Sequence, residues 1–455
     1  MQLVIIGGSD AGISAALRAR EIDPSMEVTL VVADAFPNYS ICGLPFFLSG
    51  EVTDWRTLAH RSAEDITQQG IRLLINHTAT AIDPERHIVT VLNQQQQCVD
   101  LPYDRVVIAT GATPIRPVID GVDLPGVFLL HSMADSFAVD TYIREKAPQS
   151  ALIIGGGYIG LEMADALTLR GINVTLVEHH PTVLKTVDTA FGSMVADELQ
   201  RHGVTVISGT RIEHISPQQD HLYVQGTGGF SHTADLVLAA VGVKPASSLA
   251  KQIGVETGKH DAIRVSRFME TNLPHVYAAG DCTETFHHVL QASTYLPLGT
   301  TAHKQGRIAG ENSAGHPKAF HGSLGTQVLK VFDLAIARTG LREDEALAAG
   351  FAPFTHDAIH WDHKVYYPGA HKLRIRITGD RNTGRLLGAQ MIGHWHSEIA
   401  KRIDIFATAL FHQMSVEDLS ELDLSYTPPL SSPWDPVQMS AQAWVKEVQT
   451  LEVKV

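Results

Sequence analysis

The sequence of 455 residues has little cysteine, no excess of basic charge and no long apolar run. Its three cysteines, Cys42, Cys98 and Cys282, are too few and too scattered for a disulfide scaffold, which indicates a reducing, cytoplasmic setting. Acidic residues exceed basic ones by 49 to 35, and this balance argues against nucleic-acid or anionic-membrane partners. No membrane-spanning helix or signal peptide is expected, because charges or glycines interrupt every apolar run and the opening MQLVIIGG has no basic start.

Two segments share a plan of apolar strand, glycine-rich turn and helix. They are LVIIGGSDAGISAALRARE (3–21) and ALIIGGGYIGLEMADALTLRGINVTLVE (151–178). Two such units so far apart predict two doubly wound α/β domains in one chain. After about residue 321 a predicted hairpin (371–393) and a helical pattern (397–414) indicate a third, α+β domain.

The second glycine motif is the stronger dinucleotide signal. Gly155, Gly157 and Gly160 complete G-x-G-x-x-G between a predicted strand and a helix, and Glu178 ends the next strand. The glycines let a pyrophosphate approach the helix N-terminus, and the acid can hold a ribose diol. Because Glu178 would repel a 2′-phosphate, NADH is the expected nucleotide. The two histidines that follow could soften this preference, so NADPH stays open.

The first glycine motif is less regular. Gly7 and Gly12 hold its first and last positions, but Ser9 occupies the middle one. Val32 stands where a strand-ending acid is usual, and Asp34 is the expected substitute. Taken alone, this turn is the weaker of the two signals.

The segments ATGATP (109–114) and TNLPHVYAAGD (271–281), together with the two turns, resemble the two-dinucleotide flavoprotein disulfide reductases over almost the whole chain. The resemblance implies that the first turn binds FAD and that the second binds the nicotinamide nucleotide. It implies Rossmann-like domains for FAD (1–113 and 246–320) and NAD(P)H (114–245), followed by a dimerisation domain (321–455). Further cofactor-binding residues implied in this way are Thr110 and Gly111, Asp281 at the ribityl and phosphate region, Tyr158 over the flavin, and Glu162 at the nicotinamide pocket or in helix packing.

The segment NYSICGLPFFLSG (38–50) resembles the single-cysteine branch of that family, which holds coenzyme A-disulfide reductases, NADH oxidases, NADH peroxidases and persulfide reductases. The first of these is the closest resemblance. Two-cysteine members carry C-x-x-x-x-C, whereas the position five after Cys42 is Phe47. Cys42 would therefore both attack the substrate and exchange electrons with the flavin. Since it opens a predicted helix, we expect backbone N–H groups to lower its thiol pKa.

Two tyrosines, in HKVYYPGA and LDLSYTPPL, match residues that reach the cysteine from the partner subunit of a homodimer in the disulfide reductases. These are Tyr366, with Tyr367 as its alternative, and Tyr426. A phenol can protonate a leaving thiolate, although both could be ordinary interface aromatics. Asp10 stands where the oxidases and peroxidases carry histidine, which argues against peroxide chemistry.

The resemblance also places cations near the substrate pocket, where they could hold the phosphates of coenzyme A. Residues beside the cysteine, and Glu21, differ from those usual in the coenzyme A-disulfide reductases. Another small disulfide, or a persulfide, therefore stays open as the substrate. The spacing of His394 and His396 could suit a metal, but two solvated loop histidines are the expected reading, so no metal site is predicted. The candidate substrate-binding residues are Arg18, Arg20, Asn38, Arg61, Lys304 and Arg307.

The sequence therefore predicts an FAD-dependent NAD(P)H:disulfide oxidoreductase that reduces a small disulfide, such as coenzyme A disulfide, or a persulfide. NADH would reduce FAD, and the flavin would reduce a mixed disulfide between Cys42 and half of the substrate. One alternative is a water-forming NADH oxidase in which Cys42 cycles through sulfenic acid. The other is a flavoprotein redox sensor or electron carrier.

Overall fold

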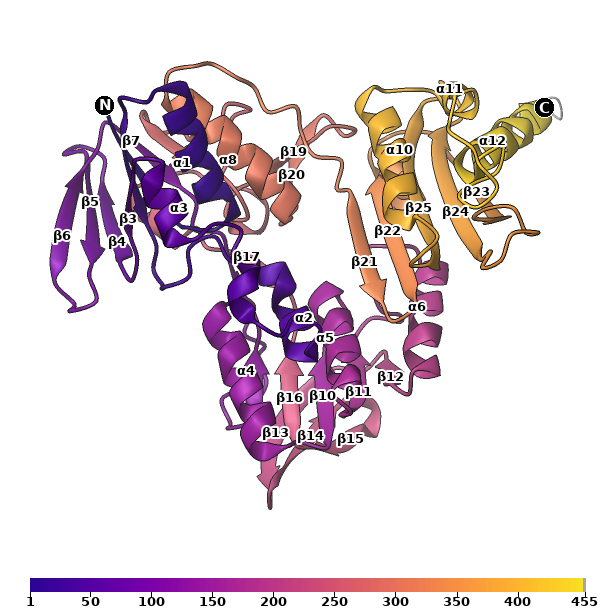
Figure 1. The fold of residues 1–455 in the computed structure, drawn as a ribbon, viewed down its shortest axis with the longest axis horizontal. Coiled ribbons are helices and arrows are strands. Elements are labelled where there is room, and N and C mark those ends of the chain that lie inside the picture. The colour runs from indigo at the N-terminus through magenta and orange to yellow at the C-terminus, as the bar shows by residue number, and fades with distance from the viewer. Residues whose placement is uncertain (453–455) are drawn as a thin grey trace.

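A computed structural model describes residues 1–452 of the chain (Figure 1). The chain forms three units, each built around a five-stranded sheet. Two of these sheets are parallel and one is antiparallel. In Figure 1 the first unit lies at the left, the second at the bottom and the third at the right. None of the helices within 1–452 is long and apolar enough to cross a bilayer.

The first sheet is parallel, with the strand order β18-β7-β1-β2-β3. Its centre is fully buried, as parallel strands require, and a three-stranded antiparallel sheet (β4-β5-β6) flanks it. The strands are β1 (Gln2–Ile6), β2 (Glu27–Val31), β3 (Ile71–Leu74), β4 (Thr78–Asp83), β5 (Ile88–Leu92), β6 (Cys98–Pro102), β7 (Arg105–Ile108) and β18 (Val276–Ala278).

Two helices of this unit, α1 and α8, pack along each other. They approach closely because glycines face backbone: a Cβ added at Gly306 would lie 2.1 Å from the Ala11 carbonyl oxygen, and one at Gly310 would lie 2.2 Å from that of Ala15. The unit also holds two short helices and a short strand pair. These helices and strands are α1 (Asp10–Ile22), α8 (Gly299–Ser313), the short helices α3 (Ala63–Gln68) and α7 (Ser248–Gln252), and the strand pair β19 (Thr285–His287) and β20 (Ala292–Thr294).

The second sheet is also parallel, with the order β12-β11-β10-β16-β9. A short pair, β8 (Ala112–Pro114) with β17 (Val243–Pro245), lies where the chain crosses between the first two units. The other elements are α2 (Leu44–Ser49), β9 (Val127–Leu129), α4 (Met133–Lys146), β10 (Ser150–Ile154), α5 (Tyr158–Leu169), β11 (Asn173–Glu178), α6 (Thr189–Arg201), β12 (Thr205–Ser208), β13 (Ile212–Gln218), β14 (His221–Gly226), β15 (Ser231–Ala234) and β16 (Leu236–Ala239).

The third sheet is antiparallel, with the order β21-β22-β25-β24-β23. Trp444 of α12 packs on it and donates a hydrogen bond of 2.8 Å to the Phe354 carbonyl. The elements are β21 (Gln327–Val331), β22 (Leu334–Gly340), α9 (Glu343–Ala348), β23 (Pro353–Trp361), β24 (Lys372–Asp380), β25 (Leu386–His394), α10 (Ile399–Phe411), α11 (Val416–Ser420) and α12 (Pro436–Glu452).

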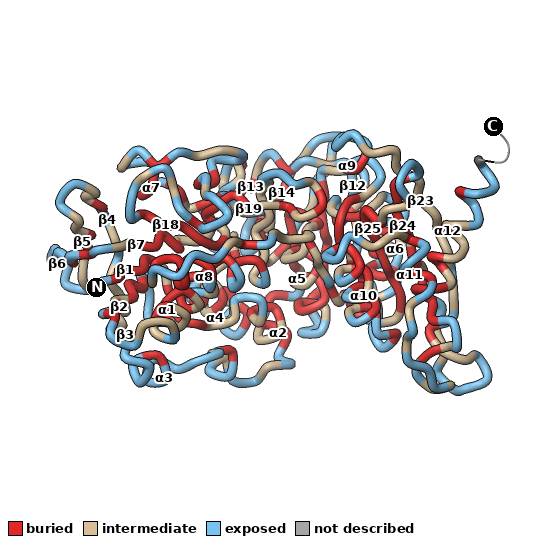
Figure 2. The backbone as a smooth tube through the Cα atoms, turned by 90° about the horizontal axis from the view of Figure 1, so that it is seen from above, coloured by how far each residue is buried: buried red, intermediate tan, exposed pale blue. Residues whose placement is uncertain are grey.

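Buried polar contacts hold the third unit against the second. Asp188, at the start of α6, lies 2.6 Å from an Arg376 guanidinium nitrogen and accepts a 2.8 Å hydrogen bond from Gln390. Asp165 of α5 accepts the backbone N–H of Phe332 at 2.9 Å. Figure 2 shows the buried backbone running through all three units. The predicted fold class, two Rossmann-like units followed by an α+β unit, is confirmed.

Candidate active site

The first glycine turn forms a cradle that side chains would fill. Gly7 has φ of +117°, and a Cβ there would lie 2.0 Å from the Ala109 carbonyl oxygen; one at Gly12 would lie 1.8 Å from that of Gly7. Ser9, the N-cap of α1, makes no side-chain capping bond, so the first N–H groups of α1 stay available. Such a helix start fits a dinucleotide pyrophosphate.

The second turn repeats this geometry at α5. A Cβ on Gly155 would lie 2.4 Å from the Ala240 carbonyl oxygen, and one on Gly160 would lie 1.9 Å from that of Gly155. Gly157, the N-cap of α5, offers no side chain to the N–H groups of the first turn. This helix start fits a second pyrophosphate in the same way.

The acids predicted to hold the two riboses differ in their setting. Glu178, 6% exposed, ends β11 and accepts backbone hydrogen bonds from Gly156 at 2.7 Å and from His180 at 2.8 Å. The carboxylate is therefore fixed beside the second turn. Asp34 is exposed, three residues beyond the end of β2, and accepts the N–H of Phe36 at 2.9 Å.

The loop that leads to Cys42 is bound to the first glycine turn. The N–H of Asn38 donates to the Gly8 carbonyl at 2.8 Å, and Asn38 adopts a left-handed φ of +58°. Its side chain is 1% exposed, yet neither amide atom has a hydrogen-bond partner in residues 1–452. A buried amide without partners is costly, so this position fits a bound polar group such as the flavin.

An aromatic cluster fixes the same loop against α4. Phe36, Tyr39, Trp55 and Phe137 form this cluster. The Phe36 ring centroid lies 5.6 Å from those of Tyr39 and Phe137, and Trp55 and Phe137 are 5.1 Å apart. Edge-to-face packing of this kind makes the loop rigid.

Cys42 lies in a single 3₁₀ turn (Ile41–Gly43) just before α2, and it is exposed. The surrounding protein still shields the thiol from much of the solvent, and this desolvation raises the thiol pKa of Cys42. The carboxylates of Glu162, Asp10 and Asp281 raise it further. One backbone hydrogen bond acts in the opposite direction. The expected lowering of the thiol pKa is therefore wrong for these surroundings, because burial and the charges of three carboxylates outweigh the single backbone hydrogen bond of the short turn.

Two of these acids hold protons more tightly than usual. Burial and the nearby Asp165 raise the pKa of Glu162 to about 7. Burial and Asp10 raise the pKa of Asp281 to about 6, against a hydrogen bond from the Leu298 backbone. Tyr158, in the turn before Glu162, bonds through its hydroxyl to the side-chain oxygen of Gln327 on β21. The protein therefore places groups that titrate near neutral pH around Cys42.

Thr110 and Gly111 follow β7 at the carboxyl edge of the first sheet. The Thr110 hydroxyl donates to the Ala246 carbonyl at 2.6 Å, and the backbone N–H of Ala246 donates to the Gly111 carbonyl at 2.9 Å. Gly111 has φ of +69° and open space at its Cβ position. These contacts tie the ATGATP turn to the crossing strand β17.

The two predicted tyrosines lie together on an exposed face of the third unit. Tyr366 is 71% exposed and Tyr426 is 43% exposed, and the neighbouring phenol of Tyr426 raises the pKa of Tyr366. The Lys364 N–H donates to the Pro428 carbonyl at 3.2 Å and joins the two loops. No hydrogen bond connects either phenol to the Cys42 loop within the part of the chain described.

The predicted substrate-binding cations differ in the contacts that their side chains already make. Arg18 and Arg307 share the Glu21 carboxylate, and Arg18 also pairs with Glu311. Arg20 donates to the carbonyl groups of Pro24 and Met26 after α1 and of Gln69 after α3, so its guanidinium holds the backbone and is not directed at a substrate. Arg61 and Lys304 are exposed and make no ion pair in residues 1–452.

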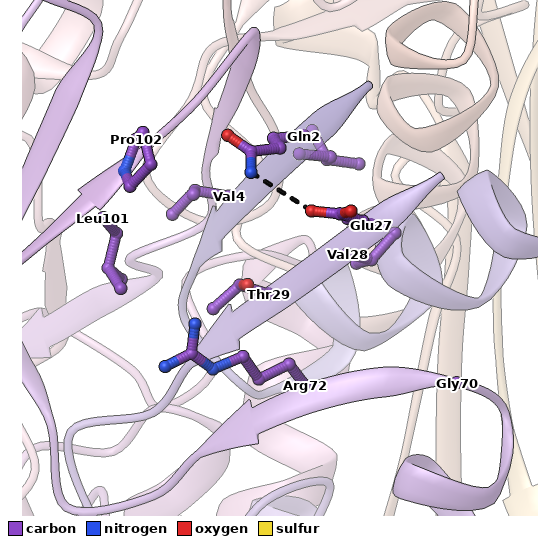
Figure 3. A pocket seen from close by; sticks show the side chains of 10 residues that line it. Gln2, Val4, Glu27, Val28, Thr29, Gly70, Arg72, Leu101 and Pro102 are labelled. Atoms are coloured by element: carbon purple, nitrogen blue, oxygen red, sulfur yellow. Dashed lines mark hydrogen bonds between the residues drawn. The ribbon is translucent and has the colours of Figure 1, made fainter. Parts of the chain in front are cut away.

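Two cavities lie away from the cysteine. One of about 320 Å³ opens at the amino ends of β1 and β2, where Gln2 donates to Glu27 at 3.1 Å and Arg72 closes one side (Figure 3). It is at the wrong edge of the sheet for a ligand of a doubly wound fold. The other, of about 360 Å³, is lined by Tyr426 and by the buried pair Arg402–Asp435.

One residue beside the start of α1 was not predicted from the sequence. His303 on α8 contacts Asp10 and Ser14 of α1. Its place directly before Lys304, a predicted substrate residue, was the one available sequence signal.

Comparisons with known proteins agree with this geometry. Residues 1–306 match the model of the pyridine nucleotide-disulphide oxidoreductases, and residues 326–436 match the dimerisation domain of that family. A CoA-dependent NAD(P)H sulfur oxidoreductase of Pyrococcus furiosus is 35% identical over 97% of this chain and 98% of its own. An NADH oxidase of Methanocaldococcus jannaschii is 31% identical over 98% and 99%.

A crystal structure of reduced CoADR-RHD from Bacillus anthracis has a TM-score of 0.96 and 32% identity, over 99% of this chain and 81% of that one. The resemblance seen in the sequence and the predicted cofactors, FAD and a nicotinamide nucleotide, are confirmed by these findings. The chain belongs to the pyridine nucleotide-disulphide oxidoreductase family.

Proposed function

We propose that this protein uses NAD(P)H, through FAD, to reduce a low-molecular-weight disulfide or persulfide at the single thiol of Cys42. The observation that carries the proposal is the isolation of an exposed cysteine on a loop bonded to the first glycine turn. Cys282 is buried, and burial raises its thiol pKa to about 11. Cys98 is exposed at the start of a flanking strand. Neither is placed to act as a resolving thiol.

The bound flavin would supply hydride acceptance and electron transfer to sulfur. Cys42 would attack one sulfur of the substrate, release a thiol and hold the other half as a mixed disulfide. Reduction of that disulfide returns the thiolate. Glu162, with its pKa of about 7, can hold or release a proton beside the sulfur at neutral pH. Tyr366 and Tyr426 are proposed as proton donors to the leaving thiolate.

The active form is proposed to be a homodimer formed by the third unit. Support comes from the match to a dimerisation domain and from large apolar side chains exposed on that unit. The two neighbouring tyrosines, Tyr366 and Tyr426, would then serve the Cys42 of the other subunit. The exposed aromatic residues include Trp361, Tyr366, Tyr367, Trp395, Phe411, Tyr426 and Trp434.

The domain limits are proposed as 1–113 with 246–320 for FAD, 114–245 for NAD(P)H and 321–455 for dimerisation. The pairing of β8 with β17 at the crossing supports the first two limits. We propose a cytoplasmic location, since three unpaired cysteines suit a reducing compartment.

Coenzyme A is proposed as one half of the substrate. Within residues 1–452, Arg61 and Lys304 are the predicted cations whose side chains make neither an ion pair nor a hydrogen bond, so their charges could meet its phosphates. The name of the Pyrococcus relative, a CoA-dependent enzyme, also supports this choice.

The test measures free-thiol release from coenzyme A disulfide under anaerobic conditions with NADH. We expect release to match NADH consumption, and Cys42→Ser to abolish release while it keeps FAD. Cys98→Ser is the matched control and should retain turnover. Rapid oxygen uptake that forms water and requires Cys42, without reduction of any disulfide or persulfide, would instead support an NADH oxidase, as the Methanocaldococcus relative is named.

The tyrosines are tested by complementation. A Cys42→Ser chain is mixed with a Tyr366→Phe/Tyr426→Phe chain, each inactive alone. Heterodimers should recover one working site if the phenols act across the interface. No recovery after verified subunit exchange would remove the proposed role in the partner.

A further inference from the structure

The N-termini of α1 and α8 meet beside the Cys42 loop. A Cβ added to Gly299, the first residue of α8, would lie 3.0 Å from a carboxylate oxygen of Asp10, the first residue of α1. The absence of a side chain at Gly299 therefore leaves room for that carboxylate between the helices. The backbone of Leu298, at the same helix start, lowers the pKa of Asp281 against the effect of burial.

His303, one turn into α8, occupies this junction. Its Nε2 lies 3.3 Å from Asp10 Oδ1, and its Nδ1 lies 2.9 Å from the Ser14 hydroxyl. Protonated imidazole has two N–H donors, and a carboxylate and a hydroxyl oxygen can both accept. The two contacts together suit the imidazolium form. His303 is about half exposed, with its side chain at 47%.

Asp10 in turn belongs to the surroundings of Cys42. It follows the turn whose Gly8 carbonyl accepts the N–H of Asn38, so the helix start and the cysteine loop share one anchor. The carboxylates of Glu162, Asp10 and Asp281 all raise the thiol pKa of Cys42. A cation placed on Asp10 therefore opposes one of the three charges that disfavour the thiolate.

We propose that His303 is a positioning residue whose imidazolium, held by Asp10 and Ser14, offsets the Asp10 charge and so favours the thiolate of Cys42. The proposal rests on the proposed role of Cys42 as the redox thiol. It concerns the ease with which that thiol ionises and involves no bond-making step of its own.

The contact between His303 and Asp10 makes the effect of His303 on the Cys42 thiol depend on pH. Contact with Asp10 raises the pKa of His303, while burial and the charge of Arg61 lower it. Below that pKa the imidazolium offsets Asp10. When pH rises through it, the imidazole becomes neutral, Asp10 is left uncompensated, and formation of the Cys42 thiolate becomes harder.

The test is the rate of alkylation of Cys42 by iodoacetamide in the holoenzyme, followed by mass spectrometry of its peptide from pH 5 to 11. The background is Cys98→Ser, which removes the other exposed thiol. At pH 7, His303→Asn should slow alkylation about three- to tenfold, whereas Asp10→Asn should change it less than twofold, because it removes both the carboxylate and the contact that holds the imidazolium. The control His316→Asn makes the same substitution at an exposed site beyond α8 and should change nothing.

A double variant separates the pairing from a general effect of charge. In an Asp10→Asn background at the same pH of 7, His303→Asn should alter the rate less than twofold, because there is no carboxylate left to offset. An unchanged alkylation profile in the single His303→Asn variant overturns the proposal, as does an equal slowing in both backgrounds. Because alkylation needs neither NADH nor disulfide, a failure of the proposed enzymatic function would be seen separately, as turnover that survives Cys42→Ser.

Discussion

Replacement of Glu162 by glutamine is expected to stabilise the protein at alkaline pH and to do little at acidic pH. Glu162 is partly buried on α5 and shares that helix with Asp165, whose carboxylate is held by the Phe332 N–H. Burial and Asp165 raise the pKa of Glu162 from 4.5 to about 7. Glutamine keeps the shape and the helix propensity but removes the charge.

The sign follows from proton linkage. Between pH 4.5 and 7 the folded protein keeps a proton on Glu162 that the unfolded chain has lost, so the free energy of unfolding falls as pH rises. The full penalty above pH 7 is about 3 kcal/mol, at about 1.36 kcal/mol for each pH unit between the two pKa values. At pH 5 it is only about 1 kcal/mol. Glu162→Gln should therefore gain about 2 kcal/mol more at pH 8.5 than at pH 5.

The assay is thermal unfolding of the FAD-loaded protein at both pH values, for the wild type, Glu162→Gln and the control Glu145→Gln, which changes an exposed glutamate on α4. A gain of 2 kcal/mol corresponds to a Tm rise of about 2 to 8 °C, according to whether the whole chain or one unit unfolds. An equal Tm change at both pH values, or a lower Tm for Glu162→Gln at pH 8.5, would refute the reasoning.

Three other predictions test separate parts of the molecule. Gly12→Ala should lose FAD, since its Cβ would lie 1.8 Å from the Gly7 carbonyl oxygen; a variant with normal flavin absorbance would show that the turn can adjust. Glu178 should make kcat/KM for NADH exceed that for NADPH by about tenfold, for a cost of about 1.4 kcal/mol to the phosphate, and equal values would contradict this. Trp444→Phe should lower the free energy of unfolding by about 1 to 3 kcal/mol in urea titrations, because the Phe354 carbonyl loses its buried donor; an unchanged midpoint would argue against that bond.

Features that depend on neighbours in sequence were predictable. The G-x-G-x-x-G turns could be recognised because close backbone approach requires glycine at Gly155 and Gly160, whatever the rest of the fold does. The hairpin of β24 and β25 and the helix α10 were visible as local periodicity; α10 lies within its predicted range, and β25 ends one residue beyond the predicted hairpin. Family resemblance added the order of the two nucleotide sites.

Features that depend on distant segments were not predictable. The raised thiol pKa of Cys42 comes first from burial and then from acids on α1, on α5 and after β18, none of which a helix-start argument can include. Arg18 pairs with Glu311, 293 positions away, so a list of nearby cations could not show that its charge is already matched. His303 was missed for the same reason, since only the packing of α8 on α1 reveals its partner.

The pairing of β18 with β7 has a consequence for synthesis of the chain. Ile108 ends β7, whereas Val276 begins β18, so an outer strand of the first sheet leaves the ribosome only after the whole second unit. At about 5 to 20 residues per second, the first sheet waits roughly 10 to 30 s with one side of β7 unpaired. An open strand edge invites association with other chains. The second unit can complete its own sheet during that interval, and translation speed between these two strands therefore bears directly on the yield of folded protein.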